Sequence, residues 1–276
     1  MLNISIDSCA DLSQHLIDAH RLRMISLHVL VNGKDHHDND LTLFQLFSNV
    51  EKTGELPKTA APSVNEFTDF FDMSEQNIYI GLSSHLSATM QNASLAAKQL
   101  EKTNLFLIDS LNLSTGIGLL ALKAADLRDA GHSALEIKEE IEKARQLVRT
   151  AFVIDTMEYL HKGGRCTGLQ AFVGSMLQIR PVIHVLPNGK LGVLEKLRGS
   201  RKKALDALID RFKSDLPEID LTRVFVTHTG CDEDADYLVN QLQGLAPIEN
   251  VYITLAGATI ASHCGPDTIG VLYLKL

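Results

Sequence analysis

The sequence predicts an α/β protein with two lobes, a mainly parallel sheet in the N-terminal lobe and a mixed sheet in the C-terminal lobe. Its 276 residues are enough for two modest domains, and 45% of them are apolar, which allows ordinary buried cores. In the first half, short apolar runs alternate with amphipathic stretches, as strands alternate with crossover helices in a parallel sheet. The second half combines a hairpin signal with helices. We therefore expect a domain boundary near Thr150, with lobes at residues 1–150 and 151–276.

Strands of the first half are expected at short apolar runs, and helices where apolar residues share one face. Residues 41–50 show such a face, and capping-box patterns that begin at Ser63 and Ser133 open two more helices. Apolar residues from Met90 onward are also spaced for one buried helix face. The expected strands are residues 4–7, 25–31, 78–82 and 106–109.

The second half contains the pattern of a β-hairpin. Asn188-Gly189 forms the centre of a turn signal between two apolar runs. A short helix is expected to end at Gly163-Gly164, and residues 200–216 are expected to form a strongly amphipathic helix. The expected strands are residues 151–155, 180–185, 191–196, 224–227, 251–255 and 269–274.

Composition excludes several classes of function. The formal charge of −8 argues against a nucleic-acid partner, because phosphate binding normally requires a basic face. The four cysteines are far apart and form no CxxC pair, so we expect reduced thiols and no disulfide framework or zinc site. The first residues have no signal-peptide pattern, and no apolar stretch reaches the roughly 20 residues that span a bilayer. We expect a soluble, cytoplasmic protein without stable membrane insertion.

Four polar segments lie at strand ends or helix starts, where open α/β sheets usually bind ligands. The first runs from Asp7 to Asp11, and a helix cap with a turn explains it about as well as a binding role. The second runs from Ser83 to Thr89 and carries four hydroxyl groups. Because simple capping accounts for one hydroxyl only, we favour a carboxylate or phosphate site at this helix start.

The third and fourth segments supply basic side chains and a histidine. Arg165 follows two glycines, and a basic stretch covers residues 196–203, which together suggest a local positive patch for an anion. Solvated surface charge explains Lys202 and Lys203 equally well. His263 is expected in a loop before the last strand, where a structural role and a binding role both stay open.

Other candidate motifs give weaker evidence for a binding site. Residues 35–40 contain three aspartates and two histidines, but these are contiguous and lack the spacing that lets side chains converge on a metal ion. We expect a solvated loop that ends in a helix cap, and no metal. The chain has neither a GxGxxG fingerprint nor a P-loop, so we expect no nucleotide cofactor.

In their order along the chain, these motifs resemble those of the DegV family, whose characterised members bind fatty acids. The resemblance covers nearly the whole chain, and eight ordered motifs are far more specific than any one of them. The matching segments are residues 7–12, 58–63, 83–89, 108–110, 162–165, 179–181, 196–198 and 263–266.

The resemblance implies a two-lobed DegV-like fold that buries an acyl chain. It also implies that a separate ATP-dependent fatty-acid kinase converts the bound fatty acid to an acyl phosphate, and that the chain has no activity or cofactor of its own. By position in the motifs, Arg165 and Arg198 are expected to face the phosphate or the kinase. The expected ligand-binding residues are Thr59, Ser63, Ser84, Ser87, Ala88, Thr89, His263 and Gly265.

The chain departs from the family pattern at positions near the expected headgroup. Ala88 stands in place of glycine, Ala60 and Ala61 in place of serine and glutamine, and Cys9 in place of threonine. These changes affect the identity of the ligand more than the family resemblance. One alternative is a carrier of another amphiphile that works without a kinase.

A second alternative is a serine-dependent lipid hydrolase. Ser84 lies on an expected strand–turn–helix, and the chain order of Ser84, an aspartate and His263 is that of α/β-hydrolases. The segment lacks the second glycine of a nucleophile elbow, and no glycine run for an oxyanion loop precedes it. We therefore favour the carrier.

Overall fold

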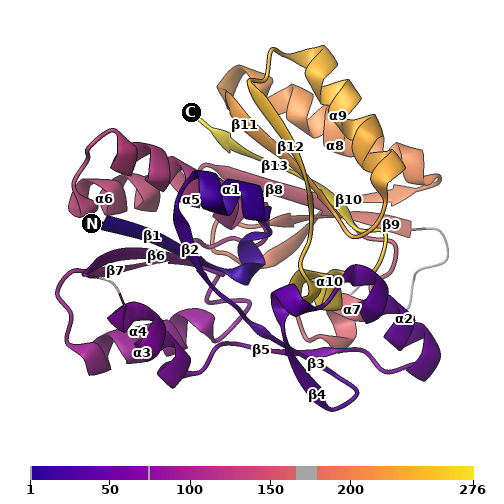
Figure 1. The fold of residues 1–276 in the computed structure, drawn as a ribbon. Helices are drawn as coiled ribbons and strands as arrows, with labels where there is room; N and C mark the ends of the chain where they lie inside the picture. Colours follow the sequence, from indigo (N-terminus) through magenta and orange to yellow (C-terminus); the bar gives the residue numbers. More distant parts are fainter. Residues whose placement is uncertain (1, 74, 166–178) are drawn as a thin grey trace.

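The structure is a computed structural model that describes residues 2–73, 75–165 and 179–276. Two sheets form the body of the molecule, and a third, small sheet lies beside them (Figure 1). Both lobes are therefore α/β, as the sequence predicts, with a parallel sheet in the N-terminal lobe and a mixed sheet in the C-terminal lobe.

The N-terminal sheet has four parallel strands in the order β2-β1-β6-β7. Its strands are β1 (Leu2–Asp7), β2 (Leu22–Ile25), β6 (Gln76–Gly81) and β7 (Leu105–Asp109). One face packs against α3 (Val64–Asp72) and α4 (Thr89–Leu100), where Phe67, Phe71 and Tyr79 are fully buried. The other face packs against α1 (Gln14–Ala19), α5 (Thr115–Asp129) and α6 (Ala134–Ala144).

The C-terminal sheet has six strands in the order β10-β9-β8-β13-β11-β12. β11 and β12 are parallel and the other neighbours are antiparallel. Helices α8 (Arg201–Asp215) and α9 (Asp232–Leu245) cover one face. The strands are β8 (Val148–Val153), β9 (Ile179–Val185), β10 (Leu191–Arg198), β11 (Ile219–His228), β12 (Asn250–Leu255) and β13 (Ile269–Lys275).

Helix α5 joins the two lobes. It contacts β1 and β6 of the first sheet and β8, β11 and β13 of the second. Because both sheets cover it, ten of its fifteen residues are buried and it shows little amphipathic pattern. Thr150 lies in β8, the strand with which the chain enters the second sheet. A lobe boundary at that residue remains our proposal.

The small antiparallel sheet has the order β4-β3-β5 and lies next to three short helices (Figure 1). Its strands are β3 (His28–Val31), β4 (Lys34–His37) and β5 (Lys58–Ala60). The helices are α2 (Leu43–Thr53), α7 (Glu158–Lys162) and α10 (Ala258–Cys264). α10 contacts α2, α7, β3 and β5, and so connects the last part of the chain with this sheet.

Three local expectations were wrong. Residues 25–31 are not one strand, because the chain leaves the first sheet at Ile25 and enters the small sheet at His28, with the Leu27 N–H donating to Ser8 Oγ (3.0 Å). Residues 35–40 are not a solvated loop, because residues 34–37 pair with β3 and Asp38 is buried. His263 is not in a loop but in α10.

The expected capping boxes and the expected hairpin are confirmed. Ser63 and Ser133 each form a complete capping box at the start of a helix. The hairpin around Gly189 joins β9 and β10 as an antiparallel pair. No helix in the described ranges is long and apolar enough to cross a membrane. Within the same ranges, no group of three histidine, cysteine or acidic residues has the arrangement of a metal site.

Candidate functional site

A cavity lies where the small sheet, the start of α4, α7, α10 and the β9–β10 hairpin meet. Most of its wall is apolar, and six leucines contribute to it. Its polar side chains include Thr59, Ser87, Arg165 and His263. The main apolar residues of the wall are Leu27, Leu82, Leu86, Leu113, Leu160 and Ile260.

The cavity shares wall residues with two neighbouring spaces. Outward, Leu86, Ser87, Arg165 and Leu191 also line an open cleft on the surface. Inward, Leu113, Ile260 and Cys264 also line a second cavity, between α10 and the C-terminal sheet. The three spaces therefore follow one another from the surface toward the interior and share wall residues.

The inner cavity is lined by several threonines, but their hydroxyl groups already have partners. Thr227 Oγ1 lies 2.9 Å from Thr254 Oγ1, Thr150 Oγ1 donates to Asn112 Oδ1 (2.7 Å), and Thr268 Oγ1 donates to the Cys264 carbonyl (2.9 Å). Since these hydroxyls are used within the protein, the inner cavity presents mainly apolar surface, including Phe152 and Leu272.

Thr59 and His263 form the central polar contact of the outer cavity. Thr59 Oγ1 lies 2.8 Å from His263 Nε2, although the two residues are 204 positions apart in the chain. β5 positions the threonine and α10 positions the histidine. Burial, together with the nearby positive charge of Arg165, lowers the pKa of His263 to about 4, so the ring is neutral at neutral pH.

The other ring nitrogen decides how this pair is protonated. His263 Nδ1 is buried and has no hydrogen-bond partner among the described residues. It faces Gly163, where an added Cβ would lie 2.4 Å from it. A proton on Nδ1 would be a buried donor without an acceptor, so we assign the proton to Nε2. Nε2–H then donates to Thr59 Oγ1, and the Thr59 hydroxyl proton is free to point into the cavity.

Ser87 and Thr89 lie at the start of α4. The Thr89 N–H donates to Ser87 Oγ (3.2 Å), and the two hydroxyl oxygens are 2.8 Å apart. Thr89 is buried, whereas Ser87 is half-buried and lines the cavity. When Thr89 donates its hydroxyl proton to Ser87, the Ser87 hydroxyl can donate to an anion in the cavity.

Arg165 lies at the border between the cavity and the surface cleft. Its Nε donates to the Leu86 carbonyl (3.1 Å) and its Nη1 donates to the Gly163 carbonyl (2.6 Å). These bonds fix the guanidinium between the start of α4 and the end of α7. The structure therefore brings Thr59, Ser87, Arg165 and His263 together around one cavity.

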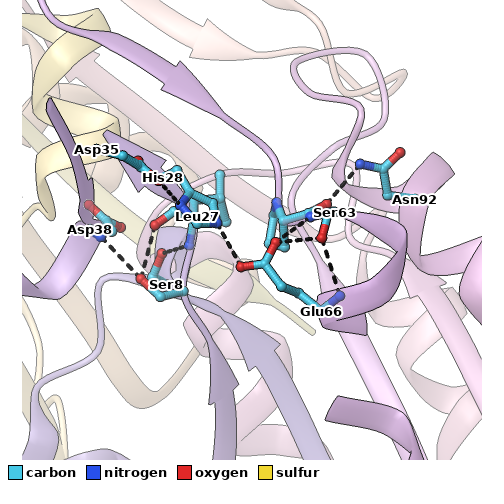
Figure 2. Close-up of polar contacts among 10 residues, drawn as sticks. Ser8, Leu27, His28, Asp35, Asp38, Ser63, Glu66 and Asn92 are labelled. Carbon is cyan, nitrogen blue, oxygen red and sulfur yellow. Dashed lines mark hydrogen bonds and ion pairs between the residues drawn. The ribbon is translucent and has the colours of Figure 1, made fainter. Parts of the chain in front are cut away.

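Ser63 lies apart from the cavity wall and caps a helix. Its side chain caps α3 by accepting from the Glu66 N–H (3.2 Å) and donating to the Glu66 carboxylate (2.6 Å). Glu66 in turn contacts His28 Nε2 (2.8 Å), whose Nδ1 contacts Asp35 (3.0 Å) (Figure 2). This group of residues ties the small sheet to α3. Ser63 does not line the cavity, and a ligand-binding role for it remains a prediction.

The other predicted residues lie outside the outer cavity wall. Ser84 and Ala88 are exposed and line only the surface cleft. Gly265 ends α10 with a φ of +81°, and an added Cβ would lie 2.7 Å from the Tyr159 ring. Arg198 is exposed at the end of β10 and lines neither the cavity nor the cleft. Its partner-facing role therefore stays a prediction.

Sequence reasoning missed the apolar wall and the role of α10. Thr259, Ile260 and Cys264 line the cavity together with His263. Positions i, i+1, i+4 and i+5 share one side of a helix, so this pattern was visible once residues 258–264 were assigned as helical. The leucines could not be found in this way, because nothing in their local pattern distinguishes a cavity wall from a core.

Comparison with known proteins extends these observations. The model of a family described as uncharacterised proteins of the DegV family matches residues 1–276. A "Fatty acid-binding protein" of Thermotoga maritima is 29% identical, over 98% of this chain and 96% of its own length. The solved structure of a DegV family protein from Thermus thermophilus, described by its fatty acid binding, is 28% identical with a TM-score of 0.91, and the alignment covers 100% of this chain and 99% of that one.

A more distant structure has the same fold. The Fatty Acid Kinase B3 protein of Streptococcus pneumoniae, loaded with linoleic acid, superposes with a TM-score of 0.87 at 23% identity. The alignment covers 99% of each chain.

Proposed function

The chain belongs to the DegV family, and on that premise we propose that it binds a long-chain fatty acid with its carboxylate in the outer cavity and its acyl chain toward the inner one. The observation that carries this proposal is the Thr59–His263 pair, a polar contact in a mainly apolar cavity. Such a combination of an apolar wall and a few fixed polar groups is typical of sites for amphiphilic ligands.

The carboxylate is recognised by donors that the protein holds in place. The Thr59 hydroxyl proton is released for the ligand because His263 donates to Thr59 Oγ1. Ser87 supplies a second hydroxyl, whereas Arg165 lies at the boundary with the cleft, where its charge faces the incoming phosphoryl group or the kinase. Hydrogen bonds to an ionised carboxylate are stronger than neutral ones. A neutral His263 adds no charge of its own and serves to orient the threonine.

The acyl chain is stabilised by apolar contact. Each buried methylene group contributes about 0.8 kcal/mol, so a chain that passes the leucines of the outer cavity gains several kcal/mol. The tail extends past Leu113, Ile260 and Cys264, the wall residues that the two cavities share, toward the inner cavity, where the threonine hydroxyls already have partners. Relatives described as binding fatty acids support the ligand class.

The second part of the proposal is the use of the bound ligand. The exposed carboxylate is presented to a separate fatty-acid kinase, which transfers the terminal phosphoryl group of ATP to it and forms an acyl phosphate. The chain itself then acts as a carrier without catalysis, in the cytoplasm where ATP is available. Support comes from the motif resemblance and from the cleft beside Arg165, through which a partner reaches the carboxylate.

A kinase assay separates the two parts. Arg165→Ala should leave fatty-acid affinity within about threefold but reduce acyl-phosphate formation by a fatty-acid kinase, because Arg165 lies between the carboxylate and the cleft. Arg211→Ala, which changes a side chain of α8 on another surface cavity, is the matched control. Equal loss of binding and phosphorylation in Arg165→Ala would mean that the arginine is structural.

The hydrolase alternative is not favoured by the geometry. Ser84 is exposed, its N–H contacts Asp109, and His263 Nε2 is used by Thr59. A fluorophosphonate probe tests it directly. Stoichiometric labelling of Ser84 would contradict a pure carrier.

Native mass spectrometry of the purified chain tests the ligand class. We expect a bound mass that denaturation releases and that lipid extraction identifies as a fatty acid. A sterol-like or other amphiphile in its place, or a chain that stays empty when incubated with palmitate and oleate, would contradict the proposed function.

A further inference from the structure

Three carboxyl groups, from Asp7, Asp11 and Asp38, are buried close enough to interact electrostatically, and two of them border the first turn of α10. Their residues are 0%, 6% and 1% exposed. Asp7 ends β1, Asp11 follows the short 3-10 helix η1 (Ser8–Ala10), and Asp38 begins the 3-10 helix η2 (Asp38–Asp40). We call these three groups the carboxyl cluster. None of them belongs to the wall of the proposed ligand cavity.

Two members of the carboxyl cluster hold the start of α10. Asp11 Oδ1 accepts a hydrogen bond from the Gly257 N–H (2.8 Å), and Asp38 Oδ1 accepts one from the Thr259 N–H (2.6 Å). A methyl group on Gly257 would lie 3.1 Å from both Asp38 carboxyl oxygens and 3.3 Å from Asp11 Oδ1. The two carboxyl groups therefore border the same point, and α10 is anchored to two segments more than 200 residues away in the chain.

The third member, Asp7, holds strand β6 and the residue that follows it. Asp7 Oδ2 accepts from the Tyr79 hydroxyl (2.9 Å) and from the Leu82 N–H (2.7 Å), and Asp7 Oδ1 accepts from the Cys9 N–H (3.1 Å). Leu82 lines the proposed cavity. The carboxyl cluster thus supports cavity residues on both the β6 and the α10 side.

The surroundings of the carboxyl cluster contain acids and neutral groups. The ionisable side chains that face it are Cys9 from η1, Tyr79 from β6 and Cys264 from α10, and a Ser114 hydroxyl before α5 donates to Asp11. In the described part of the chain, no lysine, arginine or histidine forms an ion pair with any of the three aspartates. Three buried negative charges without a cation are strongly disfavoured.

Two buried atoms in this region still need a hydrogen-bond partner. Asp38 Oδ2 and Thr259 Oγ1 form no hydrogen bond of ordinary geometry with the described residues, although the Ser8 and Thr259 side chains lie near the Asp38 carboxyl group and Cys9 lies near Thr259. A proton on the carboxyl cluster removes negative charge and adds a donor. Burial also raises the pKa of Asp7 to about 6 and the pKa values of Asp11 and Asp38 above their ordinary range.

We propose that Asp7, Asp11 and Asp38 form a proton-binding site, which holds shared protons at neutral pH and fixes α10 in position. Because the three groups interact, the protons belong to the cluster and not to one residue. The link to ligand binding rests on the proposed function, since α10 carries Thr259, Ile260, His263 and Cys264 of the cavity wall. The proton site itself does not depend on which ligand the cavity holds.

The sign of the pH dependence follows from the raised pKa values. An aspartate of the unfolded chain has a pKa near 3.9, so it is ionised at pH 6 and above. The folded state then holds more protons than the unfolded state, and this stabilisation is lost as the pH rises through the pKa values of the cluster. Each extra proton changes the unfolding equilibrium constant tenfold per pH unit.

Urea unfolding between pH 6 and pH 8 tests the site with Asp38→Asn and Asp7→Asn, and with exposed Asp40→Asn of the same 3-10 helix as the control. The histidines contribute equally to the pH dependence of unfolding in all variants, so differences between the variants are due to the carboxyl cluster. We expect the unfolding equilibrium constant of Asp38→Asn to change with pH differently from that of the unmodified chain, by up to tenfold per pH unit. The unfolding equilibrium constant of Asp40→Asn should change with pH as that of the unmodified chain does. Identical pH dependence in all four proteins would overturn the proposal.

Infrared spectroscopy of the unmodified protein keeps the test decisive if the variants fail to fold. We expect a protonated carboxylic acid band at pH 7 that disappears as the pH is raised, and its absence at pH 7 would overturn the proposal. Binding of cis-parinaric acid, a fluorescent fatty acid, gives the ligand readout. Its affinity should fall from pH 6 to pH 8 in the unmodified chain and less so in Asp38→Asn. A chain that binds no fatty acid contradicts the proposed function and leaves the proton readouts unaffected.

Discussion

At the scale of single residues, the proposed site depends on one hydroxyl group that a neutral histidine orients. Thr59 and His263 contribute no net charge, and their 2.8 Å contact joins β5 to α10. Arg165 carries a positive charge at the border of the cavity, but its Nε and Nη1 donate to backbone carbonyls and it lies on the side of the cleft. Affinity for a carboxylate should therefore respond more to the threonine hydroxyl than to any other neutral side chain of the cavity.

Thr59→Val tests that hydroxyl. Valine keeps the β-branched shape that suits β5 but cannot donate, so we expect fatty-acid affinity to fall about tenfold, or ~1–2 kcal/mol. Thr59→Ser retains the hydroxyl and should stay within about threefold. Titration calorimetry with oleate measures both variants, and equal affinities of Thr59→Val and the unmodified chain would contradict the assigned carboxylate position.

The lowered pKa of His263 leads to a second prediction, which concerns the stability of the fold. Its folded-state pKa of about 4 lies below the usual 6.5, so its contribution is present above pH 6.5 and is lost as the pH falls toward 4. Between pH 7 and pH 5 this amounts to about 2 kcal/mol. His263→Gln removes the titration, and the free energy of unfolding from urea curves should then fall less over this range. Parallel pH profiles of the variant and the unmodified chain would contradict a buried neutral histidine.

At the scale of elements, the sequence predicts what local chemistry determines. The capping boxes at Ser63 and Ser133 and the Asn-Gly hairpin are set by residues close together in the chain, and all three are present. The helix α5 was not predicted, because a helix that is covered on all sides shows no amphipathic period. The split of residues 25–31 into β2 and β3 was also not predictable, since it depends on the distant Ser8.

The same limit applies to the candidate site. Thr59, Ser87, Arg165 and His263 were named in advance because motif positions marked them, and the structure places all four around one cavity. Whether these side chains contact the ligand remains a prediction. The inner cavity could not be anticipated, because it arises from packing between α10 and the C-terminal sheet.

Two matched serines test the assignment of Ser63 to capping. Ser63→Ala and Ser133→Ala each remove the side-chain oxygen of a complete capping box. Each should lower the free energy of unfolding by about 1 kcal/mol, as measured in urea. Neither should change fatty-acid affinity by more than about twofold. A selective loss of affinity in Ser63→Ala would restore the ligand-binding role that the motif suggested.

At the scale of the whole molecule, the cavity exists because the two lobes meet around it. The β9–β10 hairpin of the second lobe reaches the first lobe at Ser83, whose Oγ donates to the Gly189 carbonyl (2.9 Å). Gly189 has a φ of +79°, and an added Cβ would lie 2.4 Å from Ser83 Oγ. Leu191, just after this turn, lines the outer cavity. The lobe contact and the cavity wall are therefore one structural unit.

Gly189→Ala tests this lobe contact against Gly131→Ala. Both glycines have a positive φ, which costs alanine about 1 kcal/mol, but an added Cβ at Gly131 meets open space. The clash with Ser83 should make Gly189→Ala a further ~1–3 kcal/mol less stable in urea unfolding. Equal losses in the two variants would mean that the hairpin can move away from Ser83 without cost.

A crystal structure of the chain with bound palmitate tests the central claim most directly. The account predicts a carboxylate oxygen within hydrogen-bond distance of Thr59 Oγ1, and an acyl chain that passes between Leu113, Ile260 and Cys264 toward the inner cavity. A carboxylate in the inner cavity, or a palmitate molecule bound only at another surface of the protein, would contradict it.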